Sequence, residues 1–230
     1  MGRSDIIVVK LGGSHAGTAH LDTWLDALAA CGGRAVIVPG GGAFADTVRA
    51  AQASIGFDDA AAHHMALLAM EQFGLALASK RPGLRIAASR DAIVAALALG
   101  KVPVWAPTAM VLAAKEIPAS WDVTSDSLAS WLAGRIGAAR LLLVKHGAPS
   151  EPLSAAELAA RGIVDPAFPR FLGGSGAQAF IAGPEAYAAA AAAIRSGGAP
   201  GACIGLHQQD ATGLHSSAWP KSKRRGGAGP

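Results

Sequence analysis

Two short apolar runs that each end in glycines constrain this chain more than any other feature. The first is Ile6–Val9, which is followed closely by Gly12-Gly13-Ser14. The second is Ala35–Val38, which is followed closely by Gly40–Gly42. Apolar runs of this length that are bounded by turn residues predict buried strands. Because glycine has no Cβ, the backbone N–H groups of both turns can approach an anion closely.

A lysine stands at the end of the first predicted strand. Lys10 is expensive to bury without an anionic partner, and its movable ammonium suits phosphate oxygens. Lys145 ends the later apolar run 140–145 in the same way, with Gly147 nearby. Neither glycine turn fits the G-x-x-x-x-G-K-[ST] phosphate loop or the G-x-G-x-x-G dinucleotide fingerprint. The sequence therefore predicts an anion site of another type, with a glycine turn on each of two walls.

Predicted strands and helices alternate along most of the chain. The predicted strands are 6–11, 35–38, 84–87, 102–105, 140–145, 179–182 and 202–206. The predicted helices are 21–31, 43–53, 60–79, 91–99, 125–137, 154–161 and 184–196, with a loop and short helix over 107–117 and an irregular segment over 165–172. Such alternation is typical of α/β proteins. We expect an open, largely parallel sheet sandwiched between helices.

Two helix starts carry candidate capping residues. Asp58 or Asp59 is the candidate N-cap of the helix at 60–79, and Thr124 or Ser125 that of the helix after Trp121. Asp126 then falls in the first helical turn, where the helix macrodipole favours a carboxylate.

Length and composition limit the remaining possibilities. The 230 residues suit a single domain over 1–206, followed by a disordered basic tail over 207–230. Four of the 20 Lys and Arg residues lie at 211–230, a segment without acids, so 16 bases face 16 acids in residues 1–210, and we expect no nucleic-acid partner. No apolar run reaches the roughly 18 residues of a membrane helix. Cys31 and Cys203 lack disulfide-framework or metal-site spacing, and with no secretory segment we expect a cytoplasmic protein without a metal site of its own.

Three motifs resemble those of the amino acid kinase family in order and spacing. They are Val9-Lys10-Leu11-Gly12-Gly13-Ser14, Val38-Pro39-Gly40-Gly41-Gly42 and Thr124-Ser125-Asp126-Ser127. The family includes acetylglutamate, aspartate, carbamate, uridylate and isopentenyl phosphate kinases, and the resemblance covers about residues 5–206. It implies an acceptor half over about 1–120, a nucleotide half over 121–206 and a homo-oligomer.

The resemblance also implies a mechanism. The acceptor is already an oxyanion, so catalysis consists of alignment and charge neutralisation without a general base. Lys10 would lie between the attacking and leaving oxygens, and Asp126 would orient Lys10 alone or together with a second lysine. The ATP-binding residues would be Gly12, Gly13, Ser14, Thr124, Ser125 and Lys145, and Gly40, Gly41 and Gly42 would hold the anionic end of the acceptor. Mg²⁺ would arrive bound through the ATP phosphates.

Two segments depart from the family pattern. Members commonly follow the strand at 140–145 with an Asp-containing turn, and here that turn is Lys145-His146-Gly147-Ala148. Many members place a second catalytic lysine in the next segment, where this chain has Arg170. Lys145 or Arg170 is therefore the candidate second catalytic cation.

Other details resemble one branch of the family, the small kinases that phosphorylate aminomethylfuran methyl phosphate in methanofuran-type cofactor synthesis. The resemblance lies in residues 62–74 and in Ser120-Trp121-Asp122-Val123 before the third motif. His63 and His64 either contact the substrate or belong to the core or a subunit contact. Trp121 either lines an aromatic wall for a furan ring or packs structurally.

The sequence thus favours an ATP-dependent kinase for a small anionic acceptor, with the aminomethylfuran phosphate as first candidate. Isopentenyl phosphate, uridylate, aspartate and acetylglutamate kinases are the alternative activities. A protein on the same fold that binds nucleotide or oxyanion without catalysis is the alternative outside enzymes.

Overall fold

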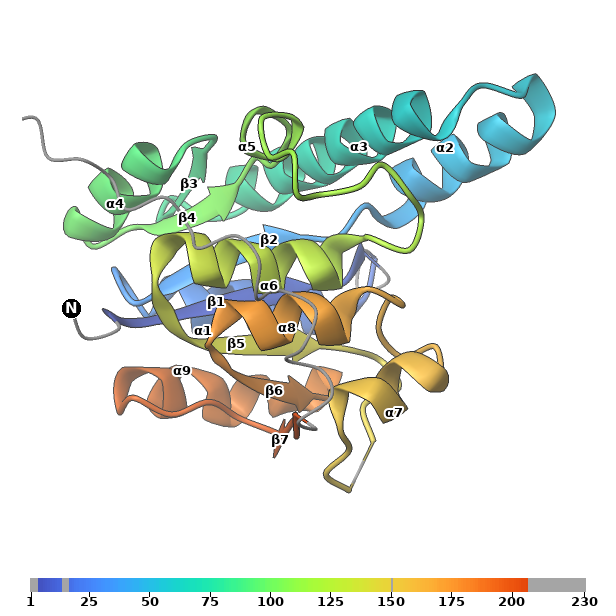
Figure 1. Ribbon diagram of the computed structural model, residues 1–230. Coiled ribbons are helices and arrows are strands. Elements are labelled where there is room, and N and C mark those ends of the chain that lie inside the picture. The colour runs from blue at the N-terminus through green and yellow to red at the C-terminus, as the bar shows by residue number, and fades with distance from the viewer. Residues whose placement is uncertain (1–3, 14–16, 150, 207–230) are drawn as a thin grey trace, which may run out of the picture.

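A seven-stranded sheet forms the centre of the computed structural model, which describes residues 4–13, 17–149 and 151–206. The strand order is β3-β4-β2-β1-β5-β6-β7, and every neighbouring pair is parallel except β6 and β7. The strands are β1 Ser4–Leu11, β2 Ala35–Pro39, β3 Leu84–Ala87, β4 Val102–Trp105, β5 Ala138–Val144, β6 Gln178–Ala182 and β7 Ala202–Cys203. The expected open, largely parallel sheet is confirmed (Figure 1).

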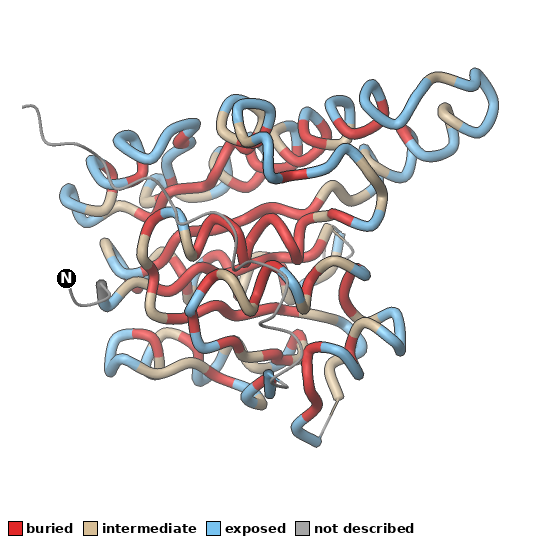
Figure 2. The backbone as a smooth tube through the Cα atoms, viewed as in Figure 1, coloured by how far each residue is buried: buried red, intermediate tan, exposed pale blue. Residues whose placement is uncertain are grey.

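Helices cover both faces of the sheet. They are α1 Ala19–Ala29, α2 Gly42–Ile55, α3 Asp59–Ser79, α4 Arg90–Ala98, α5 Thr108–Leu112, α6 Ser125–Ile136, α7 Ala155–Ala160, α8 Phe168–Ser175, the 3₁₀ turn η2 Pro184–Ala186 and α9 Tyr187–Arg195. Helices α4 to α8 bury their apolar side chains on one face, and α1, α9 and the end of α3 bury theirs on the other. Figure 2 shows the strands buried between these layers.

Strand β1 lies where the direction of the chain across the sheet reverses. The chain passes from β1 to β2 on one side, whereas β5 pairs with the other side of β1 and leads outward to β6. Ligands of open α/β sheets bind at such a switch point, beyond the carboxyl ends of the strands. Lys10 lies near that end of β1, in register with Val38 of β2 and Leu143 of β5.

Alternation along the strands sends both lysines to one face. In β1, Val8 belongs to the core under α6 and Val9 to the core on the other face, so Lys10 points to the α6 side. In β5, Leu143 belongs to the α6 core and Val144 to the opposite core. By the same alternation Lys145, directly after β5, points to the α6 side as well.

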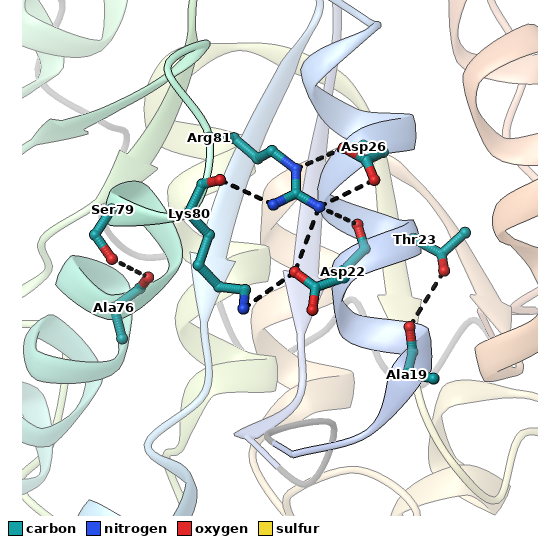
Figure 3. A network of polar contacts seen from close by, with 8 residues as sticks. All are labelled: Ala19, Asp22, Thr23, Asp26, Ala76, Ser79, Lys80 and Arg81. Carbon is teal, nitrogen blue, oxygen red and sulfur yellow. Dashed lines mark hydrogen bonds and ion pairs between the residues drawn. The ribbon is translucent and has the colours of Figure 1, made fainter.

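Helices α2 and α3 form a long antiparallel pair that extends away from the sheet (Figure 1). The end of α3 is tied to α1 by ion pairs, drawn in Figure 3: Arg81 binds Asp26 and Asp22, and Lys80 Nζ lies 3.1 Å from Asp22 Oδ1. Close to this end, a Cβ on Gly74 would lie 3.3 Å from the Pro39 ring of β2, so α3 approaches the sheet tightly there.

Three predicted elements differ from the structure. The segment 165–172, predicted to be irregular, contains α8, because Pro169 falls in its first turn, where proline removes no helical hydrogen bond. The strand predicted over 202–206 ends at Cys203, because after the Ile204 N–H bond to Ala179 of β6 the chain turns away and Gly205 bridges to Ser154. The helix predicted over 184–196 begins as the 3₁₀ turn η2 and is α-helical from Tyr187.

Among the described residues, no helix is both long enough and apolar enough to cross a membrane.

Candidate active site

The two glycine turns are in direct backbone contact. A Cβ on Gly13 would lie 2.1 Å from the Cα of Gly42, and a Cβ on Gly40 would lie 2.6 Å from the nitrogen of Gly13. Real Cβ atoms do not approach other atoms so closely, and Gly42 also has a positive φ of 55°. Only glycine therefore allows β1 and β2 to end in adjoining loops. The turns form neighbouring walls, as the sequence predicts.

Both candidate lysines meet one buried carboxylate. Lys10 Nζ lies 3.0 Å from Oδ1 of Asp126, and Lys145 Nζ donates a 2.6 Å hydrogen bond to Oδ2. The contact with Lys10 lacks hydrogen-bond geometry, since Oδ1 receives no hydrogen bond from the described residues. Lys10 and Asp126 are buried, and the side chain of Lys145 is 18% exposed. Two cations thus share one anion and carry a net positive charge at the switch point.

The charges of this cluster shift its pKa values. Burial opposes ionisation of Asp126, but the two lysine charges outweigh it, so the pKa of Asp126 lies below its ordinary value of 3.8. Burial and the charge of Lys10 lower the pKa of Lys145 from its ordinary 10.5, although Asp126 acts in the opposite direction. Asp126 is therefore a fixed anion, and Lys145 is a cation that loses its proton more easily than an exposed lysine.

The first turn of α6 is capped by a distant residue. Thr124 occupies the N-cap position, but its hydroxyl donates to Asp165 instead of accepting from its own helix. Asp165 Oδ2 accepts the N–H groups of Thr124 and Ser127, each at 3.0 Å. Of the two predicted N-cap residues the structure has Thr124, but the side chain that accepts the helical N–H groups is that of Asp165. The N-cap of α3 is predicted to be Asp58 or Asp59. In the structure it is Asp58, whose side chain accepts a hydrogen bond from the Ala61 N–H.

A pocket of about 300 Å³ adjoins the cluster. Its walls come from the two glycine turns, from the faces of α2 and α3, and from the segment that leads into α6. The lining residues include Gly13, Gly40, Gly41, Gly42, Asp46, Arg49, Asp59, His63, Leu67, Met70, Trp121, Thr124 and Ser125. Ser125 directly precedes Asp126, and Gly13 follows Lys10 by three residues. The pocket therefore borders the lysine cluster.

Trp121 is fixed at the wall of this pocket. Its indole N–H donates to Oε1 of Gln52 at 2.7 Å, and the Arg49 guanidinium lies 4.2 Å from its ring centroid. The Gln52 amide in turn donates to Asp59 at 2.9 Å. A cation on an aromatic face and a paired indole N–H both stabilise the position of the ring. Trp121 is thus part of an ordered wall that joins α2 to the α6 segment.

The two histidines of α3 have different surroundings. His63 is buried and lines the pocket, and burial, with the charge of His64, lowers its pKa from 6.5. His64 is exposed and is not among the lining residues. Of the two predicted contacts, the structure brings His63 to the pocket and leaves His64 outside it.

The remaining predicted residues lie elsewhere or outside the described chain. Arg170 is exposed on α8, where it donates to the Glu116 carbonyl oxygen at 3.3 Å and lies over the Phe171 ring. The structure therefore brings Lys145, and not Arg170, to the Asp126 carboxylate. Gly12 is buried at the end of β1, beside Gly13. Ser14 and the tail over 207–230 lie outside the described residues.

Sequence reasoning missed several residues of this region. Asp165 falls in the segment predicted to be irregular, and its carboxylate, which caps α6, lies 38 residues beyond Ser127. Asp46, Arg49 and Gln52 follow the second glycine turn at helical spacing, which is a usable signal for one polar face of α2.

The donor set suits phosphate oxygens more than a bare metal ion. Ammonium groups and exposed glycine N–H groups bind phosphate, whereas Mg²⁺ prefers several oxygen ligands. Among residues 4–13, 17–149 and 151–206, no three His, Cys, Asp or Glu side chains are grouped to hold a metal ion. These residues fit a metal that is carried by the phosphates of a nucleotide.

Fold and site together define an α/β protein with a paired-lysine centre at the switch point of its sheet. The sequence profile of the amino acid kinase family matches residues 5–147. The chain belongs to the amino acid kinase family. It is therefore a phosphotransferase, and family membership implies the use of ATP.

Three solved structures have the same fold. Uridylate kinase from Archaeoglobus fulgidus superposes with a TM-score of 0.64 at 17% identity, covering 87% of this chain and all of that one. UMP kinase from Bacillus anthracis superposes with a TM-score of 0.63 at 16% sequence identity, and the match covers 89% of this chain and 96% of that one. UMP kinase from Ureaplasma parvum superposes with a TM-score of 0.59 at 16% sequence identity, and the match covers 78% of this chain and 89% of that one. No curated protein matches the chain in sequence. At these identities the likeness concerns the fold.

Proposed function

We propose that this protein transfers the γ-phosphoryl group of ATP to a small anionic acceptor bound in the 300 Å³ pocket. The observation that carries the proposal is the convergence of Lys10 and Lys145 on Asp126, beside two touching glycine turns. Within one domain, residues before about 120 would form most of the acceptor site and residues 121–206 most of the nucleotide site.

The roles of the residues follow from their charges. An acceptor oxyanion attacks the γ-phosphorus as the bond to the ADP oxygen breaks, so no proton has to be removed. Lys10 neutralises charge between the attacking and leaving oxygens, and the N–H groups of Gly12 and Gly13 bind γ-phosphate oxygens. Lys145 supplies the second cation, and Asp126 holds both lysines in place. Mg²⁺ neutralises phosphate charge when it is bound with ATP.

We propose aminomethylfuran methyl phosphate as the acceptor and its diphosphate as the product. The pocket offers groups for each part of such a molecule. The N–H groups of Gly41 and Gly42 and the Arg49 guanidinium suit a phosphate, whereas the Gly40 N–H already donates to the Leu11 carbonyl oxygen; Asp46 and Asp59 suit an ammonium group. The Trp121 ring, with Leu67 and Met70 nearby, suits a flat apolar ring.

The test is ADP release by purified protein with ATP, Mg²⁺ and a panel of acceptors. The panel contains the furan phosphate, its analogue without the amine, UMP, isopentenyl phosphate, aspartate and acetylglutamate. We expect the furan phosphate to give the highest kcat/KM and the amine-free analogue a lower value. Higher turnover with UMP would replace the proposed acceptor by the one named for the similar structures. No ADP with any acceptor would leave the binding-protein alternative.

Replacement of Lys10 distinguishes an enzyme from a binding protein. Lys10→Ala should lower kcat by about 10²- to 10³-fold, the range found when one transition-state donor is removed. The variant should remain folded, because Lys145 still pairs with Asp126. Lys115→Ala, which changes an exposed lysine, is the matched control and should keep full activity. Equal nucleotide binding without any turnover in both proteins would contradict catalysis.

We also propose that the protein is a cytoplasmic homo-oligomer. Met65, Leu68 and Leu75 of α3 are 39%, 41% and 58% exposed, and they recur at helical spacing on one face. A second copy of the same helix face would cover them, since apolar stripes on long helices are usually buried. Both cysteines are free, which supports a reducing compartment.

A further inference from the structure

A second buried carboxylate, Asp165, lies behind the lysine cluster. It is 7% exposed and belongs to the segment between α7 and α8. Its Oδ2 accepts from the Thr124 N–H, the Thr124 hydroxyl and the Ser127 N–H at 3.0, 2.8 and 3.0 Å. Its Oδ1 accepts from the Ser127 hydroxyl. Four donors from one helical turn therefore converge on this carboxylate.

The two residues that make these four contacts lie on either side of Asp126 in the sequence. Thr124 precedes it by two residues and Ser127 follows it directly, so the backbone on both sides of Asp126 is held by one anion. The neighbouring segments are also joined, because the N–H of Ala167 donates to the Asp122 carbonyl at 3.0 Å. Gly134 and Ser175 bring α6 and α8 into close contact further along. The first turn of α6 is thereby fixed in rotation and position.

We propose that Asp165 is a positioning residue for phosphoryl transfer, which fixes the first turn of α6 so that Asp126 presents one oxygen to each lysine. Asp126 contacts Lys10 and Lys145 through different oxygens, so a rotation of this turn would lengthen one contact as it shortened the other. Misplacement of a catalytic group by about 1 Å can cost about 10²-fold in rate. This inference rests on the proposed function.

The arrangement maintains an unfavourable charge contact. Burial and the nearby negative charge of Asp126 raise the pKa of Asp165, against the effect of its hydrogen bonds with Ser127 and Thr124. A cap required only to stabilise a helix could be a neutral side chain, as Ser89 is at the start of α4. A carboxylate beside Asp126 instead accepts from four donors at once, which a single hydroxyl cannot do.

The central experiment is a double-mutant cycle with Asp126. Asp165→Ala should lower kcat by about 10- to 100-fold. In the Asp126→Asn background the same change should lower kcat less than about 3-fold, because Asp165 acts through Asp126. An equal loss in both backgrounds, or no loss in the first, would overturn the proposal. Ser154→Ala, which removes the capping box of α7, is the matched cap control and should leave kcat unchanged.

A conservative variant separates hydrogen bonding from charge. In Asp165→Asn the amide oxygen can accept three of the four hydrogen bonds, and the Ser127 hydroxyl can turn to accept from the amide N–H. We expect kcat within about 3-fold of the unmodified protein, hence rescue relative to Asp165→Ala. Loss equal to that of Asp165→Ala would contradict a role that rests on these contacts. If Asp165→Ala does not fold, Ser127→Ala enters the same cycle with a smaller expected loss.

A second readout keeps this inference separate from the proposed function. The ammonium of Lys145 can be titrated by NMR without any substrate. Asp165→Ala should shift the pKa of Lys145, because the ion pair with Asp126 loses its alignment, and Ser154→Ala should not. An unchanged titration would overturn the positioning role even if the protein is an active kinase. Absence of turnover with a shifted titration would overturn only the proposed function.

Discussion

Lys10 and Lys145 bind the two oxygens of one carboxylate, although 135 positions separate them in the chain. Lys10 is in register with Leu143 of β5, and Lys145 lies two residues further along on the same side of the sheet. The lysines therefore meet because β1 and β5 are neighbours at the switch point. Asp126 of α6, the helix that covers this side of the sheet, then binds both lysines.

The pH dependence of kcat should report on Lys145. Because the pKa of Lys145 is lowered from 10.5, its ammonium is lost, and kcat should fall, at a pH below 10.5. The folded protein binds fewer protons than the unfolded chain between the two pKa values, so the contribution of Lys145 to the free energy of unfolding rises with pH there. Activity and this stability contribution should thus change in opposite directions, as pH–rate profiles and pH-dependent denaturation can check.

Lys145→Arg is the corresponding variant. Arginine stays protonated in this range, so the alkaline fall in kcat should move to higher pH even if the maximal rate is lower. Lys115→Arg on the surface should leave the profile unchanged. If the dependence of kcat on pH is the same in Lys145→Arg as in the unmodified protein, the fall in kcat at high pH belongs to another group.

Gly13→Ala should destabilise the protein by about 1 to 3 kcal/mol or more, because the new Cβ would lie 2.1 Å from the Cα of Gly42 and force the two turns apart. Activity should fall as well, since these turns bind phosphate in the proposed mechanism. Gly83→Ala is a suitable control, with its nearest contact an ordinary 3.6 Å to Ala29. Urea denaturation of both variants measures the difference, and equal stabilities would contradict the close contact of the turns.

Trp121→Phe should weaken acceptor binding while keeping an aromatic ring. The indole hydrogen bond to Gln52 is lost, at a cost of about 0.5 to 1.5 kcal/mol, so the acceptor KM should rise roughly 3- to 10-fold. The KM for ATP should stay the same. Trp131→Phe removes an indole hydrogen bond to Glu116 away from the pocket and should leave both KM values unchanged. A rise in the KM for ATP alone would move Trp121 to the nucleotide side.

Leu68→Glu should shift the protein toward monomers in light scattering at micromolar concentration. The side chain is 41% exposed on a helix whose charged residues between Asp59 and Lys80 are limited to Glu71. A buried charge on that face would oppose the packing of a second copy. Leu99→Glu, on an equally apolar but isolated residue that is 77% exposed, should not change the mass. A monomeric unmodified protein would contradict the proposed oligomer.

Local chemistry alone predicts many features of this structure. Apolar runs followed by glycines marked β1 and β2, and alternation with helices gave the parallel sheet. The burial of Lys10 required an anion, and Asp126 fell at a helix start. Prolines obscured α8, because their effect depends on whether they occupy the first turn, which the pattern of residues did not settle.

Sequence by itself determined the fold class, the two glycine turns and the need of Lys10 for an anionic partner, because each follows from periodicity or from the expense of burying a charge; the pairing with Asp126 was implied by the family resemblance. Only the tertiary structure decided that Lys145 and not Arg170 completes the centre, that His63 and not His64 faces the pocket, and that Asp165 caps α6. Those choices depend on which strands are neighbours and which helix faces meet. Contacts between residues far apart in the chain leave no local pattern from which they could be read.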